Sequence, residues 1–147
     1  MIEQIQSSCR KCAPSEAGGL LLGYRKGIDF EVIAATLPNQ WDRASSARFV
    51  RSVRGHRIRA LREWKKSQGS VDWIGEWHSH PHGALRPSYI DLTNWKKLRT
   101  QTGKEMVFAI VGFNDLGLWL QSRPLGRAVH LDLKLGDDAG SLFEVKK

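Results

Sequence analysis

Three histidines, two serines and an aspartate lie close together in EWHSHPHGALRPSYID, residues 76–91 of this 147-residue chain. His78 and His80 are separated by one residue at the end of a predicted strand, so a period of two places both imidazoles on one face. The proline-containing loop that follows can fold back so that the next helix presents Asp91 to the pair. Two neutral imidazoles and one carboxylate suit zinc, and three protein ligands leave a fourth position open, as in catalytic zinc sites.

Ser88 fits two roles at the start of that helix. It is well placed as the N-cap, and S-x-x-D matches the capping pattern with Asp91 at the third helical position. A hydroxyl three residues before a metal ligand would also lie one turn away, on the same face and beside the metal.

Hydrolysis at a zinc site also needs a carboxylate that accepts a proton without binding the ion. Glu16 precedes GGLLLGY, whose two leading glycines let neighbouring backbones approach closely. Glu76 lies two residues before His78 on the same strand face, which suits either a partner of a metal ligand or an ordinary edge residue. The residue types alone leave the choice between the two glutamates open.

Hydrophobic periodicity predicts the elements that must position these residues. Ile2, Ile5, Cys9 and Cys12 form the apolar stripe of an N-terminal helix, and we prefer this to a functional C-x-x-C because no second Cys/His pair follows. The other predicted elements are strands at GGLLLGY with Arg25, at 30–36 and at ARFVRS, a loop at LPNQWDRASS, a helix at 56–67, a strand at 71–78, a helix at 88–98, a hairpin of KEMVFAIVGF and LGLWLQSR, and a last strand at 127–135 before a fraying tail. This order predicts an α/β (α+β) fold, one domain over residues 1–147 with a mixed sheet flanked by helices.

Charge and composition narrow the class of protein further. The chain is 41% apolar and 26% charged, which is typical of a globular chain, and its net charge of +8 favours acidic partners. We interpret the helix at 56–67 as a solvated amphipathic helix with Ile58, Leu61 and Trp64 on its apolar face. Nucleic acid is not an expected partner, because no stacking aromatics are interleaved with the basic residues. No signal sequence or membrane-spanning run is recognisable, so we expect a cytoplasmic protein without a membrane partner.

Glu16, then His78-Ser79-His80-Pro81, then Ser88-x-x-Asp91 together resemble the JAMM motif of the JAB/MPN metalloprotease family, E…H-S/T-H-P-x(6)-S-x-x-D. Every position of that motif is filled, and the predicted elements follow the family's order over nearly the whole chain. The resemblance implies a JAB/MPN-type domain that holds one Zn²⁺ through His78, His80 and Asp91. It also implies that Glu16 is the general base and that Ser88 stabilises the oxyanion, with no role for either cysteine.

Within that family, GEWHSHP is similar to the bacterial deconjugating peptidases of ubiquitin-like systems, including the peptidase of CBASS antiphage operons. This likeness implies hydrolysis of the peptide or isopeptide bond after the C-terminus of a ubiquitin-like protein, or of a conjugated target such as a cGAS-like nucleotidyltransferase. It implies that the substrate tail lies extended along a sheet edge, and that an E1–E2-type conjugating enzyme is a partner.

Two alternatives to a peptidase stay open on the sequence: a non-catalytic MPN scaffold or binding module, and a JAB-fold protein associated with nucleic acid. We expect His82 to be an exposed loop residue, and we expect His56 and His130 to be structural or surface residues. Trp77 is expected in the core on the side of the sheet opposite the metal, and Trp95 is expected to pack its helix onto the sheet.

Overall fold

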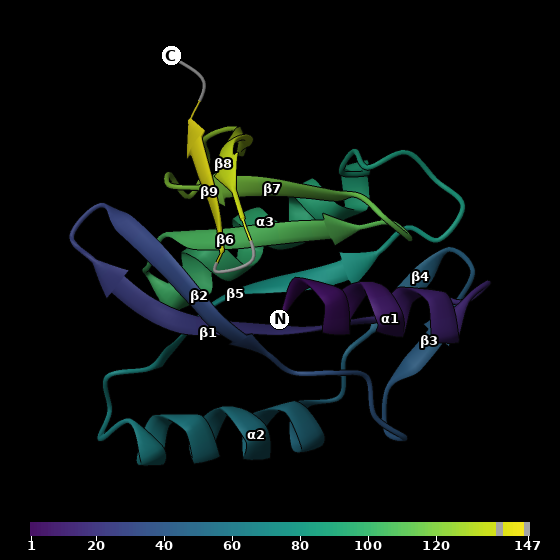
Figure 1. The fold of residues 1–147 in the computed structure, drawn as a ribbon, viewed down its shortest axis with the longest axis horizontal. Coiled ribbons are helices and arrows are strands. Elements are labelled where there is room, and N and C mark those ends of the chain that lie inside the picture. Colours follow the sequence, from purple (N-terminus) through teal and green to yellow (C-terminus); the bar gives the residue numbers. More distant parts are fainter. Residues whose placement is uncertain (138–139, 146–147) are drawn as a thin grey trace.

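The computed structural model describes residues 1–137 and 140–145 (Figure 1). Its elements are α1 (Ile2–Cys12), β1 (Gly18–Lys26), β2 (Asp29–Ala35), β3 (Arg43–Ser45), β4 (Arg48–Val50), α2 (Val53–Lys66), β5 (Asp72–Ser79), α3 (Tyr89–Thr102), β6 (Met106–Val111), β7 (Leu116–Gln121), β8 (Val129–Gly136) and β9 (Ser141–Val145). The expected α+β architecture, a mixed sheet flanked by helices, is confirmed.

The main sheet has the strand order β2-β1-β5-β6-β7-β8-β9, and β3 pairs with β4 in a separate hairpin. Only β5 and β6 run parallel, and the remaining neighbours in the main sheet are antiparallel. Gly18 at the start of β1 lies opposite His78 near the end of β5. The segment that precedes β1 is therefore brought beside the histidine strand, although about sixty residues separate the two in sequence.

The two faces of β6 support two packed layers, because alternate strand residues point to opposite sides. On one face, α1 inserts Ile5 and Cys9 into a core that also contains Trp77. On the other, Trp95 of α3 stacks on Phe108 with ring centroids 4.6 Å apart. In Figure 1, α1 crosses in front of the sheet and α3 lies behind it. The expected stripe of α1 and the expected positions of both tryptophans are confirmed.

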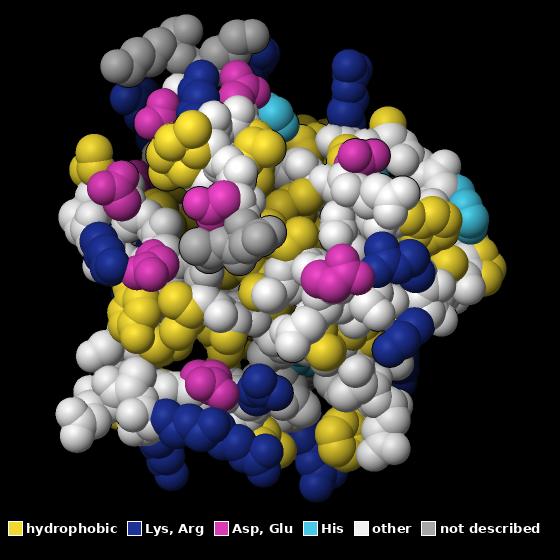
Figure 2. Space-filling view, viewed as in Figure 1, with side chains coloured by type: hydrophobic (Ala, Val, Ile, Leu, Met, Phe, Trp, Pro, Cys, Tyr) yellow, Lys and Arg dark blue, Asp and Glu magenta, His cyan; other side chains and the backbone are white. Residues whose placement is uncertain are grey.

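The expected orientation of the basic helix is wrong. This helix, α2, begins at Val53 rather than at His56 and exposes the residues expected on its buried side: Ile58, Leu61 and Trp64 are 44%, 45% and 50% exposed. Lys and Arg side chains gather along the lower edge of the molecule, where α2 lies (Figure 2). The buried residue is His56, whose ring nitrogens contact Thr36 and Asp42. The polar contacts of His56, together with Ala60 packed against Leu20 and Leu22, therefore set which face of α2 meets the protein, and the expected apolar stripe does not.

Other boundaries also differ from the expected ones. The expected loop at LPNQWDRASS contains β3, and α3 continues to Thr102 instead of ending near Leu98. The strand expected to be last is followed by β9, which pairs antiparallel with β8, so residues 141–145 of the expected fraying tail are ordered. The remainder of that tail, at 138–139 and 146–147, lies outside the described residues. Among the described helices, none is long and apolar enough to cross a membrane.

Candidate metal centre

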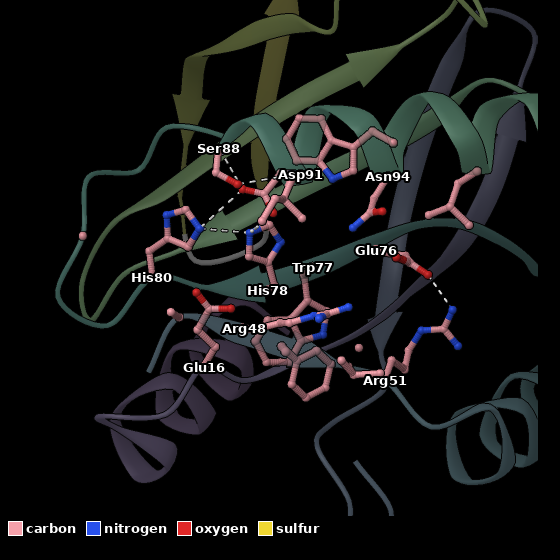
Figure 3. A pocket seen from close by; sticks show the side chains of 18 of the residues that line it. Glu16, Arg48, Arg51, Glu76, Trp77, His78, His80, Ser88, Asp91 and Asn94 are labelled. Atoms are coloured by element: carbon pink, nitrogen blue, oxygen red, sulfur yellow. Dashed lines mark hydrogen bonds and ion pairs between the residues drawn. The ribbon is translucent and has the colours of Figure 1, made fainter. Parts of the chain in front are cut away.

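Three side chains converge where β5 ends and α3 begins, and we call them the metal cluster: His78, His80 and Asp91 (Figure 3). The Nε2 atoms of the two histidines lie 3.1 Å apart. The Asp91 carboxylate places Oδ1 3.3 Å from Nε2 of His78 and Oδ2 3.7 Å from Nε2 of His80. All three side chains are 15–17% exposed, so the cluster is partly buried and still open to the cavity.

The ring of His80 is oriented by the loop that follows it. Its Nδ1 lies 2.9 Å from the carbonyl oxygen of Ala84. A carbonyl only accepts, so Nδ1 carries the hydrogen, and Nε2 of a neutral ring keeps its lone pair toward Asp91 and His78. A backbone carbonyl that fixes the tautomer in this way is the usual outer partner of a metal-binding histidine.

Asp91 is held by the N-terminus of its own helix. Ser88 N donates to Asp91 Oδ2 at 2.7 Å, and Asp91 N donates to Ser88 Oγ at 3.2 Å, which completes the predicted capping box. Burial alone would raise the pKa of Asp91, but hydrogen bonds and charge interactions with the two histidines outweigh burial and hold that pKa well below its usual range. The carboxylate is therefore ionised and available to a cation.

Glu16 is held beside the metal cluster by the contacts of the residues that follow it in the chain. Ser79, between the two histidines, donates its backbone N–H to the carbonyl of Ala17, and its Oγ accepts the Ala17 N–H at 2.8 Å. At Gly18, a Cβ atom would lie 2.6 Å from the ring of Phe49 and 2.8 Å from the carbonyl of Trp77, so only glycine permits this close approach. The Glu16 side chain points toward the two histidines (Figure 3).

The pKa of the Glu16 carboxyl is raised, because burial disfavours its charged form more than the nearby histidines favour it. The charge of Asp91 raises it further, and a backbone hydrogen bond from Phe49 lowers it. A carboxyl with a raised pKa beside two imidazoles is suited to accept and return a proton near neutral pH.

The metal cluster opens into a cavity of about 780 Å³. The floor of the cavity is β5, one wall is residues 46–51, which include the turn of the β3–β4 hairpin and β4, and the other wall is α3. Glu76 lies on the floor, and its carboxylate pairs with Arg51 at 2.6 Å. Glu76 is not an edge residue, because β5 is an interior strand. Among the described residues its ion-pair partner is Arg51, and it makes no contact with a histidine.

Sequence reasoning selected the ligand candidates but missed the residues that support them. Strand alternation points Ser79 away from the face of the two histidines, and no local pattern gives Arg51 a role. The serine had a local signal, because a small polar residue on the buried face of a central strand needs a hydrogen-bond partner. Arg51 had none, since its contact with Glu76 spans 25 residues. His82 is exposed in its loop, as expected, with its ring edge-on to Phe113.

The donor set fits zinc. Two imidazole nitrogens and a carboxylate oxygen lie within 4.8 Å of one another, and one histidine has its tautomer fixed with Nε2 free. Calcium and magnesium prefer oxygen ligands, which this cluster offers from one side chain. Glu16 stands beside the cluster without belonging to it.

A mixed sheet with two converging imidazoles on an interior strand, and an aspartate at the start of the next helix, defines a domain able to hold one metal ion. Residues 1–121 match the family of prokaryotic homologs of the JAB domain, and the chain belongs to this family. It is similar to a protein of Pseudomonas aeruginosa named CD-NTase/cGAS isopeptidase, with 34% identity over 143 residues, or 96% of this chain and 80% of that protein.

Two further proteins are similar to this chain. A protein of Escherichia coli that is also named CD-NTase/cGAS isopeptidase is 29% identical over 120 residues, which cover 82% of this chain and 72% of that protein. The solution structure of a protein from Desulfitobacterium hafniense has a TM-score of 0.62 at 24% identity, covering 97% of this chain and 84% of that one. This last likeness concerns the fold alone.

Proposed function

We propose that this chain is a zinc-dependent isopeptidase. It would hydrolyse the peptide or isopeptide bond after the C-terminus of a ubiquitin-like protein, or of a conjugated target such as a cGAS-like nucleotidyltransferase, in CBASS-type antiphage defence. The observation that carries the proposal is the convergence of His78, His80 and Asp91 beside Glu16. The names of the relatives support the reaction and the kind of substrate. All of residues 1–147 would form one such domain, and an E1–E2-type conjugating enzyme would make the bond that it cleaves.

In this proposal His78, His80 and Asp91 hold Zn²⁺, which when bound supplies Lewis acidity that lowers the pKa of water and polarises a carbonyl. Glu16 accepts the proton of the attacking water and returns it to the leaving amine. Its raised pKa makes the first transfer easier than it would be for an ordinary glutamate, because a carboxylate with a higher pKa is a stronger base. The protein needs no covalent intermediate for this route.

Ser88 is proposed as the donor to the oxygen on which negative charge develops. Its Oγ accepts the N–H of Asp91, and its hydroxyl also hydrogen-bonds to the Asp91 carboxylate. In this proposal that hydroxyl turns to the substrate oxygen when the carboxylate is occupied by the metal. Ser88 is exposed at the cavity, so a substrate can reach it. Donors of this kind are fixed before the reaction begins, and losing one typically slows an enzyme about 100- to 1000-fold.

The cavity suits an extended chain. Within the described residues β4 pairs with β3 and with no other strand, so its other edge faces the cavity, where the Phe49 N–H bonds to the Glu16 carboxylate. A substrate tail that adds to this edge would form main-chain hydrogen bonds irrespective of its sequence. The scissile bond would then lie at the end of the cavity where Glu16 and the metal cluster meet.

The test is to purify the chain, determine its zinc content, and assay cleavage of a ubiquitin-like protein fused through its C-terminus to a fluorescent amine. We expect about one zinc per chain, loss of cleavage after chelation, and recovery after zinc is returned. The variant Glu16→Gln should keep the zinc and lose cleavage. Glu31→Gln, the same change on β2 outside the cavity, is the matched control and should cleave normally.

Full activity of Glu16→Gln would exclude the assigned base. Absence of zinc from protein prepared with zinc available would favour the non-catalytic scaffold instead. Zinc binding without cleavage of any C-terminal amide would leave a metal protein whose reaction is not the one proposed.

A further inference from the structure

The cavity carries charge that the proposed reaction does not use. Apart from Glu16 and the metal cluster, its lining includes three cations and a single anion: Arg48, Arg51, Lys97 and Glu76. Arg51 is neutralised by Glu76 at 2.6 Å and lies over the ring of Trp73. Arg48 and Lys97 form no ion pair with any described residue. Two cations in the cavity lining are therefore left without a counter-charge.

These two cations lie on opposite walls. Arg48 begins β4, and Figure 3 shows it between Glu16 and Arg51 along the hairpin wall. Lys97 belongs to α3, six residues after Asp91, which is about 9 Å along the helix axis. An extended chain advances about 3.3 Å per residue, so it passes Lys97 about three residues from the bond at the metal cluster. A substrate tail in the cavity would therefore pass between Arg48 and Lys97 within about three residues of the scissile bond.

The surroundings favour an anionic group there. Glu16 and Asp91 face the metal position, and Glu76 is occupied by Arg51, so no carboxylate of the cavity lining remains to pair with Arg48 or Lys97. A concave wall also focuses the field of its charges more than a flat surface does. A substrate carboxylate would complete the charge balance of the cavity, whereas a lysine or arginine would meet two like charges.

We propose that the cavity selects tails with an aspartate or glutamate within about three residues before the scissile bond, held by Arg48 and Lys97. This specificity rests on the proposed function, since it concerns the tail that the isopeptidase would cleave. Arg48 and Lys97 are specificity-determining residues in this scheme and take no part in the bond-breaking steps.

The experiment compares three carrier proteins that differ only in their tails, each joined through its C-terminal amide to a fluorescent amine. The second and third residues before the bond are both Glu, both Gln or both Lys. For the unmodified enzyme at low salt, we expect kcat/KM to fall from Glu to Gln to Lys, by about three- to tenfold at each step. The spread should narrow as salt rises, because these charges are partly exposed.

The double variant Arg48→Glu with Lys97→Glu should reverse the order and cleave the Lys tail best. Because both residues are exposed, this change should leave the fold intact, and the milder pair Arg48→Gln with Lys97→Gln should flatten the order. The control pair is Arg57→Glu with Arg62→Glu on α2, which makes the same change in net charge outside the cavity and should keep the original order.

An unchanged order in the double variant, or an equal shift in the control pair, would overturn the specificity proposal. So would equal cleavage of the three tails by the unmodified enzyme. These outcomes differ from failure of the proposed function, in which none of the tails is cleaved with zinc present, or all are still cleaved by Glu16→Gln.

Discussion

Aspartate contacts histidine at three places among the described residues: a surface pair of His130 with Asp132, and two clusters, of which one opens into the cavity at the end of β5 and the other is buried. In the metal cluster, His78 Nε2 lies 3.3 Å from Asp91 Oδ1. In the second, which we call the buried cluster (Thr36, Asp42 and His56), Nε2 of the histidine lies 3.0 Å from the aspartate. Residue types and distances are nearly the same, so the surroundings must decide what each cluster does.

The buried cluster is closed to a ligand, because its side chains bond within the protein and its histidine and aspartate are buried. The carboxylate of Asp42 accepts the backbone N–H groups of Asn39 and Ser52 as well as a ring nitrogen of His56. The other ring nitrogen lies 2.5 Å from Thr36 Oγ1. The histidine and aspartate side chains are 0% and 4% exposed. Because Asp42 precedes β3 and Ser52 follows β4, this cluster fastens the base of the hairpin that forms the cavity wall.

The metal cluster differs because its nitrogen atoms point at one another. His78 and His80 bring two Nε2 atoms to 3.1 Å, a distance that leaves room for a proton or a shared cation and gives no stable contact between two bare lone pairs. The cavity gives solvent access to that point. Histidine and aspartate therefore act as a structural link when the protein completes their bonding, and as a metal site when it leaves one convergent position open.

His80→Ala should have the largest effect on the metal cluster. Removing one of three ligands should release the zinc and reduce kcat/KM by about a thousandfold or more, since a bound metal supplies several kcal/mol at the transition state. Metal analysis after dialysis and the amide-cleavage assay measure both effects. His82→Ala, two residues away in the same loop, is the matched control, and a comparable loss of zinc there would contradict the assigned ligand set.

Ser88→Ala should follow in size. Loss of the hydroxyl should reduce kcat about 100- to 1000-fold with zinc retained, because the oxyanion loses a donor. The helix cap is also lost, which should lower the free energy of unfolding by about 1 kcal/mol. Ser88→Thr keeps a hydroxyl and should recover much of both. If the threonine variant recovers stability but not kcat, a hydroxyl at the cap is not sufficient for catalysis. If the alanine variant has a normal kcat, Ser88 serves only as the helix cap.

His56→Ala makes the same chemical change in the buried cluster and should have the opposite signature. It leaves a buried carboxylate with one partner fewer and opens a cavity, which should lower the free energy of unfolding by about 2–4 kcal/mol. Zinc content under native conditions should not change. Denaturant unfolding measures the loss of stability, and metal analysis of the same preparation measures the zinc content. A loss of zinc with no loss of stability would contradict the distinction between the two clusters.

The comparison also explains which parts of the structure were predictable. His78 and His80 follow from strand alternation, and Ser88 with Asp91 follows from the spacing of a capping box, because each is a local geometric relation. Glu16 is not local: its position depends on hydrogen bonds between residues about sixty positions apart, and only the resemblance to a known motif predicted it.

Burial was the least predictable property, because tertiary partners decide it. Ile58, Leu61 and Trp64 formed a plausible apolar face, yet α2 is fixed by His56 in the buried cluster, and that contact turns the apolar residues outward. The local pattern left Glu76 as either a partner of a metal ligand or an edge residue, because its actual partner, Arg51, follows β4 and is 25 residues away in sequence. In both cases a polar contact between distant segments outweighed a local hydrophobic pattern.

The smallest expected effect concerns pH: the pKa of Asp42 and the pKa of Glu16 are shifted in opposite directions, so the two carboxylates should change stability with pH in opposite ways. Burial would raise the pKa of Asp42, but its hydrogen bonds outweigh burial and lower it, whereas the pKa of Glu16 is raised by burial. In metal-free protein, Asp42 therefore adds stability above its unfolded pKa of about 4 and loses it as pH falls. Glu16 does the reverse: the stability that it adds below its unfolded pKa is lost as pH rises through its pKa in the folded protein.

Measured against the unmodified chain, Asp42→Asn should be more destabilising at about pH 7 than at about pH 3. Glu16→Gln should become more stable relative to the unmodified chain over the same rise in pH. Parallel slopes for the two variants would show that the carboxylate of the cavity and the carboxylate of the buried cluster do not differ in the way their surroundings require.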